Sequence, residues 1–295
     1  MDKRFNDSAY ASPIFILGTQ RSGTTLLTRI LSSHSKLFIQ NEVNVLKVFK
    51  NATSKTDILN ALDSQISSRH DVTIKQILAR SENSLWGVKD PQLTEYIPQL
   101  KLFLPESKFI IIVRDGRGVV NSYKNNKWGL GTNVYSGTLR WLFEVSEQKK
   151  FMQENPQQVL LLRYEDIIKD TSQEIKKICH HLQLEFEPEM LEYYLQKALY
   201  KKNKSNINTN KEPDASFAEK WKQELSKHEI DIIEHLAKEQ LISNDYDLIG
   251  CSIHISFLEK YYYKFHQMIV GEYQIQFQLK NLYIKQKLKK WGLLK

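Results

Sequence analysis

A glycine-framed segment with several hydroxyl side chains follows the first apolar run of the chain. It reads Gly18-Thr19-Gln20-Arg21-Ser22-Gly23-Thr24-Thr25 and leads into helix-spaced apolar residues at 26–31. This is the frame of the phosphate-binding G-x-x-x-x-G-K-[ST] loop, in which backbone N–H groups and the positive end of a helix hold a phosphate. Thr24 stands at the lysine position, which argues against ordinary ATP or GTP chemistry. The hydroxyls of Ser22, Thr24 and Thr25 offer further hydrogen-bond donors to a phosphate. The alternative, a tight turn without ligand, is disfavoured because strand, glycines and helix occur together.

A second polar segment follows the apolar run at 108–113. Arg114 leaves that run, and Gly116 and Gly118 turn the chain before a predicted helix. This helix would carry Ser122 in its first or second turn, so Arg114 and Ser122 could reach one anionic group from two sides. The intervening Asp115 also resembles the acidic end of a Walker B strand, which keeps the reading of this segment open.

Four short apolar runs predict the strands of one parallel sheet, since each is followed by helical periodicity. Their residues are 13–18, 85–89, 108–113 and 157–162. The predicted fold class is α/β, a P-loop-like parallel sheet flanked by helices on both faces. Ligands of open parallel sheets lie beyond the carboxyl ends of the strands, so cations at these ends predict a polyanion site. The cations that end or follow the runs are Arg21, Lys89, Arg114 and Arg163.

The composition of the 295 residues excludes several classes of protein. With 41% hydrophobic and 11% aromatic residues, the chain can bury a core and is not a disordered protein. Its longest apolar stretch, 109–113, is far shorter than the ~20 residues of a membrane-spanning helix, and its first residues lack the apolar stretch of a signal peptide. We therefore expect a cytoplasmic location. The net charge of +8 suits anionic ligands. Cys179 and Cys251 lack metal-ligand spacing, which predicts two reduced core thiols without disulfide or zinc.

The two polar segments together resemble the donor-binding motifs of sulfotransferases that use 3′-phosphoadenosine 5′-phosphosulfate (PAPS). The likeness rests on R-S-G-T-T-L-L from Arg21 and on I-V-R-D-G-R-G-V-V-N-S-Y from Ile112. It is nearest to the tyrosylprotein sulfotransferase branch and its bacterial relatives, and it covers most of residues 13–248. The resemblance implies that no metal takes part and that Arg114 and Ser122 hold the 3′-phosphate of the donor. It assigns the 5′-phosphosulfate to Arg21, Ser22, Gly23, Thr24 and Thr25.

The same resemblance assigns the residues of the chemistry. Sulfuryl transfer to an alcohol needs a base for the acceptor proton and cations for the charge that develops. Glu42 lies 21 positions after Arg21, the offset at which the tyrosylprotein branch has its base, although a solvated loop carboxylate is equally expected from the sequence alone. Lys89 matches a family lysine that approaches the transferring group, and Arg21 would stabilise the sulfuryl oxygens. Asp90 follows Lys89 where small-molecule sulfotransferases have a histidine base, which favours Glu42.

Three later residues match the same branch. Tyr164, after the fourth apolar run, matches a nucleotide contact, although a core tyrosine explains it equally well. Ser205 and Lys220 match the family's S…K-W pair, fifteen positions apart. Ser205 is thereby a candidate for both catalysis and donor binding. Its basic loop, residues 201–206, would act as a lid over the donor or be an ordinary exposed loop.

The sequence leaves the hydroxyl-bearing acceptor open, since a glycan, a small alcohol or phenol and a tyrosine offer the same nucleophile. In the tyrosylprotein branch, arginines just past the base help to recognise acidic peptides. Here Glu42 is followed by Val43, Asn44 and Val45, which puts specificity for peptide tyrosine in doubt. Residues 50–84 are the expected place for acceptor specificity.

We expect a sulfotransferase domain over residues 1–250 and a basic amphipathic helical segment over residues 251–295. The segment has no acidic residue after Glu272, and its lysines alternate with apolar residues. Such a helix can pack its apolar face on the domain, which is the favoured arrangement, or lie on an anionic membrane surface.

The chain is therefore predicted to be a PAPS-dependent sulfotransferase with Glu42 as general base. Two rivals belong to other classes. A Mg²⁺-dependent P-loop nucleotide kinase or other phosphotransferase is opposed by Thr24 at the lysine position. A basic nucleic-acid-binding module would draw on the net charge, but the chain has no recognisable reader motif, and we expect no nucleic-acid partner.

Overall fold

The computed structural model describes residues 7–80, 84–126, 129–195 and 216–290. The chain divides into two compact units, and each unit is made of two separate stretches. Unit 1 comprises Met1–Arg114 and Glu144–Ala215, and unit 2 comprises Asp115–Phe143 and Ser216–Lys295. The domain boundary expected at residue 250 stays a prediction.

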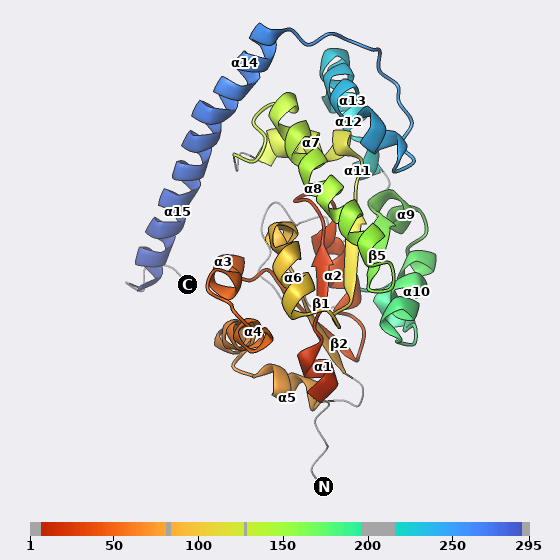
Figure 1. Ribbon diagram of the computed structural model, residues 1–295, viewed down its shortest axis with the longest axis vertical. Helices are drawn as coiled ribbons and strands as arrows, with labels where there is room; N and C mark the ends of the chain where they lie inside the picture. The colour runs from red at the N-terminus through yellow and green to blue at the C-terminus, as the bar shows by residue number, and fades with distance from the viewer. Residues whose placement is uncertain (1–6, 81–83, 127–128, 196–215, 291–295) are drawn as a thin grey trace. The chain divides into compact units, whose positions relative to one another are not determined.

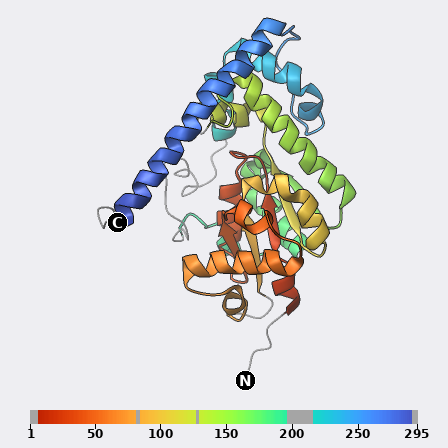
Figure 2. The same cartoon turned by 60° about the vertical axis from the view of Figure 1, so that its left-hand side comes forward.

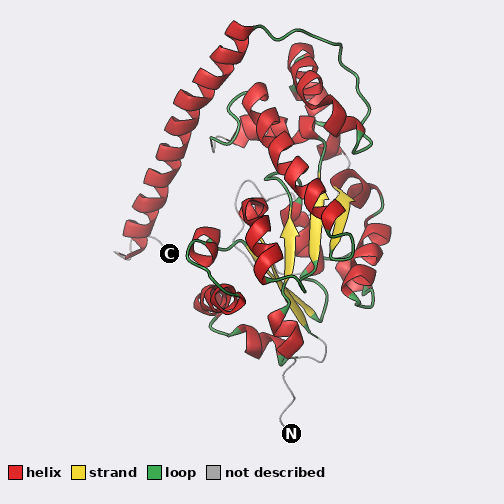
Figure 3. Ribbon diagram, viewed as in Figure 1, coloured by secondary structure: helices red, strands yellow, loops and turns green. Residues whose placement is uncertain are grey.

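Unit 1 is built on a parallel sheet of five strands (Figures 1 and 3). They are β1 (Ile14–Leu17), β2 (Leu37–Asn41), β3 (Leu85–Lys89), β4 (Phe109–Val113) and β5 (Val159–Arg163). The strand order is β2-β3-β1-β4-β5, and every neighbouring pair is parallel. All residues of β1 and β4 are buried, as expected for central strands covered on both faces. The predicted α/β class is confirmed.

Helices of unit 1 lie on both sides of this sheet (Figures 1 and 3). The α-helices are α1 (Asp7–Ala11), α2 (Thr24–Leu31), α3 (Val45–Phe49), α4 (Lys55–His70), α5 (Ile74–Leu78), α6 (Ile97–Phe103), α9 (Tyr164–Lys169) and α10 (Thr171–Leu182). The 3₁₀ helices are η1 (Pro91–Tyr96) and η2 (Pro188–Met190). The long helix α8 (Val134–Glu154) is divided between the units at Glu144.

The sheet has one strand more than the four predicted from the sequence. The additional strand, β2, is at the edge of the sheet and pairs with β3 from Leu37↔Leu85 to Asn41↔Lys89. It ends in two polar residues, Gln40 and Asn41, so its apolar run is too short to stand out. This strand places Glu42 directly after a strand end, beside the end of β3.

Unit 2 is helical in its described residues. Besides the first part of α8 it has α7 (Gly116–Asn126), α11 (Ser216–Glu219), α12 (Trp221–Glu224), α13 (Lys227–Ile242), α14 (Phe257–His266), a π turn (Gln267–Gly271) and α15 (Glu272–Lys290). Figure 2 shows the last three as one continuous helix, in blue. No helix within the described ranges is long and apolar enough to cross a membrane.

Cys179 of α10 is buried but Cys251 is exposed, so the prediction of two core thiols is wrong for Cys251.

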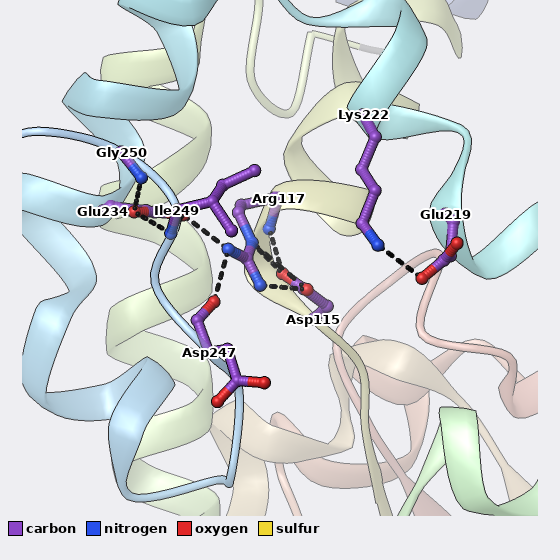
Figure 4. Close-up of polar contacts among 8 residues, drawn as sticks. All are labelled: Asp115, Arg117, Glu219, Lys222, Glu234, Asp247, Ile249 and Gly250. Atoms are coloured by element: carbon purple, nitrogen blue, oxygen red, sulfur yellow. Dashed lines mark hydrogen bonds and ion pairs between the residues drawn. The ribbon is translucent and has the colours of Figure 1, made fainter.

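A buried ion network within unit 2 joins the start of α7 to α13 (Figure 4). The Arg117 guanidinium donates to Asp115 at 2.7 Å from Nη2 and at 3.0 Å from Nε, and it also donates to Glu234. It lies 4.1 Å from the ring centroid of Trp221. Burial acts to lower the pKa of Arg117, but the hydrogen bonds and charges of Asp115 and Glu234 outweigh it and raise that pKa. Asp115 thus has a structural partner, which explains this acidic residue without a Walker B role.

Candidate active site

Residues predicted from separate parts of the chain lie at one edge of the unit 1 sheet. The loop after β1, Glu42 after β2, Lys89 at the end of β3 and Arg114 after β4 follow strands that all run in the same direction. Tyr164 follows β5 in the same way. Because the carboxyl ends of parallel strands share one edge, these side chains converge there.

The loop between β1 and α2 is closed by its own polar groups. The Ser22 backbone N–H and hydroxyl both donate to the Thr19 carbonyl, at 3.1 and 2.7 Å. Helix α2 begins at Thr24, after Gly23 in the left-handed conformation with φ 98°. The Ser22 hydroxyl is thus used within the loop, while the amino end of α2 has the location expected of a phosphate site. The assignment of the donor to Ser22, Gly23 and Thr24 stays a prediction.

Arg114 and Tyr164 support this loop from neighbouring strands. Arg114 Nη1 donates to the Arg21 carbonyl at 3.0 Å, and the Arg114 guanidinium lies 4.6 Å from the centroid of the Tyr164 ring. A Cβ at Gly23 would lie 2.4 Å from Tyr164 Cδ2, so the tyrosine ring packs directly against the loop. Arg21 itself has φ 72°, a strained backbone conformation for a residue with a side chain. These contacts hold the loop in a shape that its own residues would not favour.

Lys89 links the loop to the candidate base. Its side chain is buried, with 1% of its surface exposed, and Nζ lies 3.0 Å from Glu42 Oε1 and 3.5 Å from Thr25 Oγ1. The Glu42 side chain is 56% exposed, so its carboxylate is accessible from solvent as well as bound to Lys89. One buried ammonium therefore lies between a carboxylate and a hydroxyl of the loop after β1.

The backbone of Glu42 is held in an uncommon conformation. Its N–H donates to the Lys89 carbonyl at 2.7 Å, and its φ is 57°. The Asp90 carboxylate accepts from the N–H of the next residue, Val43, at 3.2 Å. Burial raises the pKa of Asp90, although backbone N–H groups of Gln92 and Val43 act to lower it. The backbone on both sides of Glu42 is therefore tied to the end of β3.

Arg69, in the last turn of α4, is a further candidate residue that the sequence did not reveal. Its Nη1 donates to the Glu42 carbonyl and, at 3.3 Å, to the Asn41 carbonyl. Nothing in the local sequence marks this arginine, because it is 27 positions from Glu42 and belongs to no motif. It lies within residues 50–84, the region expected to determine acceptor specificity.

Two of the remaining predicted residues belong to unit 2. Ser122 is in α7 and Lys220 is the N-cap of α12, both in unit 2. Lys220 is exposed, and its Nζ lies 4.2 Å from the Phe217 ring centroid. Ser205 is outside the described residues. Within the described parts of the chain, no group of three His, Cys, Asp or Glu residues could hold a metal ion.

Residues 13–188 match a family model described as "Sulfotransferase family". The Caenorhabditis briggsae protein named "Putative protein-tyrosine sulfotransferase" is 27% identical over 202 residues, which cover 63% of this chain and 71% of that protein. Human protein-tyrosine sulfotransferase 1 is 29% identical over 144 residues, 43% of this chain and 39% of the human protein. The chain thus spans well under two thirds of the human protein.

Among solved structures, the sulfotransferase domain from the curacin biosynthetic pathway has the same fold. Its TM-score is 0.58 at 23% identity, and the superposition covers 81% of this chain and 99% of that domain.

Proposed function

The chain belongs to the sulfotransferase family and is a sulfotransferase, and from that premise we propose that it transfers the sulfuryl group of PAPS to an acceptor hydroxyl with Glu42 as general base. The observation that carries the proposal is the location of Lys89 Nζ, 3.0 Å from Glu42 Oε1 and 3.5 Å from Thr25 Oγ1. It brings a candidate base, a cation and a phosphate-binding loop within contact of one another.

The two separate anionic groups of PAPS agree with the cations that this site provides. The loop lacks the usual lysine because Thr24 takes its position, yet Lys89 from β3 brings a buried ammonium to the neighbouring Thr25. Arg114, which is tied to the loop through the Arg21 carbonyl, adds a second cation at the same sheet edge. A donor with separate phosphate and phosphosulfate groups fits separated cations better than a single triphosphate chain does.

The proposed reaction is an in-line displacement at sulfur. The Glu42 carboxylate takes the proton of the acceptor hydroxyl, whose oxygen then forms a bond to sulfur while the bond between sulfur and the 5′-phosphate oxygen breaks. Lys89 and Arg21 stabilise the charge that develops on the sulfuryl oxygens and on the leaving phosphate. The products are a sulfate ester and 3′-phosphoadenosine 5′-phosphate (PAP).

We propose no single acceptor beyond the hydroxyl class. The relatives are named for protein tyrosine, but Val43 and Val45 are buried here and Asn44 accepts from the Lys47 N–H as the N-cap of α3. This segment therefore presents no arginine to an acidic peptide. An arginine instead approaches from α4, where Arg69 donates to the Glu42 backbone carbonyl.

Isothermal titration of PAP and of ATP, each with and without Mg²⁺, tests the donor. We expect PAP to bind without metal and ATP to bind weakly under both conditions. Lys89→Met should weaken PAP binding, whereas Lys101→Met, which removes a half-exposed lysine of the same unit, should leave it unchanged. Magnesium-dependent ATP binding with no response to PAP would show that the donor assignment is wrong.

A further inference from the structure

The continuous helix of α14, the π turn and α15 carries a stripe of exposed apolar side chains. Leu258 is 78% exposed and Tyr273 is 70% exposed, and the four others of the stripe are at least half exposed. The stripe consists of Leu258, Tyr262, Phe265, Ile269, Tyr273 and Phe277. Successive members are three or four positions apart, so they share one face over roughly 30 Å of helix.

Another face of the helix is attached to the rest of unit 2 by polar contacts. The Asn133 side chain donates to the Tyr263 carbonyl at 2.9 Å, and the Thr132 N–H donates to Gln267 Oε1 at 2.8 Å. Gln267 Nε2 in turn donates to the Gly129 carbonyl at 2.7 Å. Tyr263 and Gln267, which make these contacts, lie between stripe residues in the sequence and on another face of the helix. The stripe therefore points away from the face that unit 2 holds.

The π turn keeps the stripe on one side. A spacing of four residues advances about 40° beyond a full turn of an ideal α-helix, so repeated steps of four would wind around it. The wider turn at Gln267–Gly271 absorbs one such residue. Gly129, with φ 76°, approaches this turn so closely that a Cβ would lie 2.6 Å from the Gly271 carbonyl oxygen. The turn is thus built into the packing of the unit.

The chemistry of this helix fits a lipid surface with negative charge. Four of the six stripe residues are aromatic, and phenylalanine and tyrosine are suited to the boundary between acyl chains and headgroups. Residues 257–290 contain seven lysines and two glutamates, and one glutamate, Glu259, lies 3.1 Å from His228 of the same unit. Such lysines attract anionic headgroups.

A second copy of the chain fits this face less well. Buried tyrosine hydroxyls need polar partners, which Tyr262 and Tyr273 would lack against another apolar stripe. Two lysine-rich helices would also be brought together. We propose that the stripe Leu258–Phe277 and the lysine-rich part of the helix that follows it bind the surface of an anionic lipid bilayer, with the helix lying along the membrane.

Vesicle flotation of the full chain tests this proposal. We expect the protein to float with vesicles of phosphatidylcholine and phosphatidylserine, and to float much less with phosphatidylcholine alone or at high salt. The double variant Phe265→Glu with Tyr273→Glu should reduce the bound fraction at least tenfold. The matched control, Leu102→Glu with Ile242→Glu, replaces two exposed apolar residues elsewhere and should bind like the unmodified chain.

Three readouts decide the outcome. Equal flotation of the stripe variant and the control variant would overturn the proposal. So would the absence of flotation together with a dimer, by analytical ultracentrifugation, that the stripe variant converts to a monomer, because the stripe would then join two copies. Unchanged PAP titration and an unchanged melting temperature of the stripe variant would show that the loss of flotation is not a loss of folding or of donor binding.

Discussion

Replacing Glu42 by glutamine separates the proposed base from the structural role of the same side chain. Glutamine keeps an oxygen that can accept from Lys89 Nζ, which lies 3.0 Å from Oε1 in the native chain. It cannot take a proton from the acceptor. Loss of a general base lowers a rate by about 10²–10⁴, which corresponds to about 2.7–5.4 kcal/mol of barrier at 1.36 kcal/mol for each factor of ten.

The same change should alter stability much less. The Glu42 side chain is 56% exposed, which keeps its ion pair near the ~0–1 kcal/mol of surface pairs. Lys89 is buried, but the glutamine oxygen retains its hydrogen bond. We therefore expect a loss of about 1 kcal/mol, which lowers the melting temperature of a chain of this size by about 2–4 °C.

The assay is single-turnover transfer from labelled PAPS to a panel of a phenol, an alcohol and a tyrosine peptide, beside a thermal melt. Glu106→Gln, an exposed carboxylate of the same unit, serves as control and should change neither result. A rate for Glu42→Gln within tenfold of the unmodified chain would refute the base assignment. A lost rate with equally weakened PAP binding would also refute it, since Glu42 would then support the donor.

Three further predictions concern stability. Arg117→Met leaves Asp115 and Glu234, which are 5% and 4% exposed, without their cation. Urea denaturation should therefore show a free energy of unfolding that is lower by about 3–5 kcal/mol. A decrease below about 1 kcal/mol would contradict a stabilising role of the network. Arg21→Gly and Arg21→Ala should both be nearly inactive. The glycine variant should be more stable than the alanine variant by about 1 kcal/mol, because φ is 72° at this position. Equal melting temperatures of the two variants would count against backbone strain at Arg21. Burial, followed by the charge of Lys108, lowers the pKa of His181 from 6.5, so its contribution to stability is present above pH 6.5 and is lost as the pH falls through the folded pKa. The melting temperature should fall on acidification below pH 6.5, and His181→Gln should flatten this slope; an unchanged slope would exclude His181 as its cause.

Much of unit 1 follows from local patterns. The runs IFIL and FIIIV are apolar at every position, so burial on both faces requires central parallel strands. The glycine frame before Thr24 likewise specifies a strand, a turn and a helix within a few residues. The apolar run of the edge strand β2 is too short to predict a strand, although the candidate base Glu42 follows it directly.

The sequence by itself determined four of the five strands, the glycine frame of the loop after β1 and most of the candidate site residues, because these depend on neighbours along the chain. Tertiary structure alone decided that Lys89 meets Glu42 across 47 positions, that Arg69 reaches the Glu42 carbonyl, and that Arg114 holds the Arg21 carbonyl. It also decided which face of the carboxyl-terminal helix packs against the rest of unit 2. Contacts between distant residues depend on how strands and helices pack, and no local pattern of residue types encodes that distance or direction.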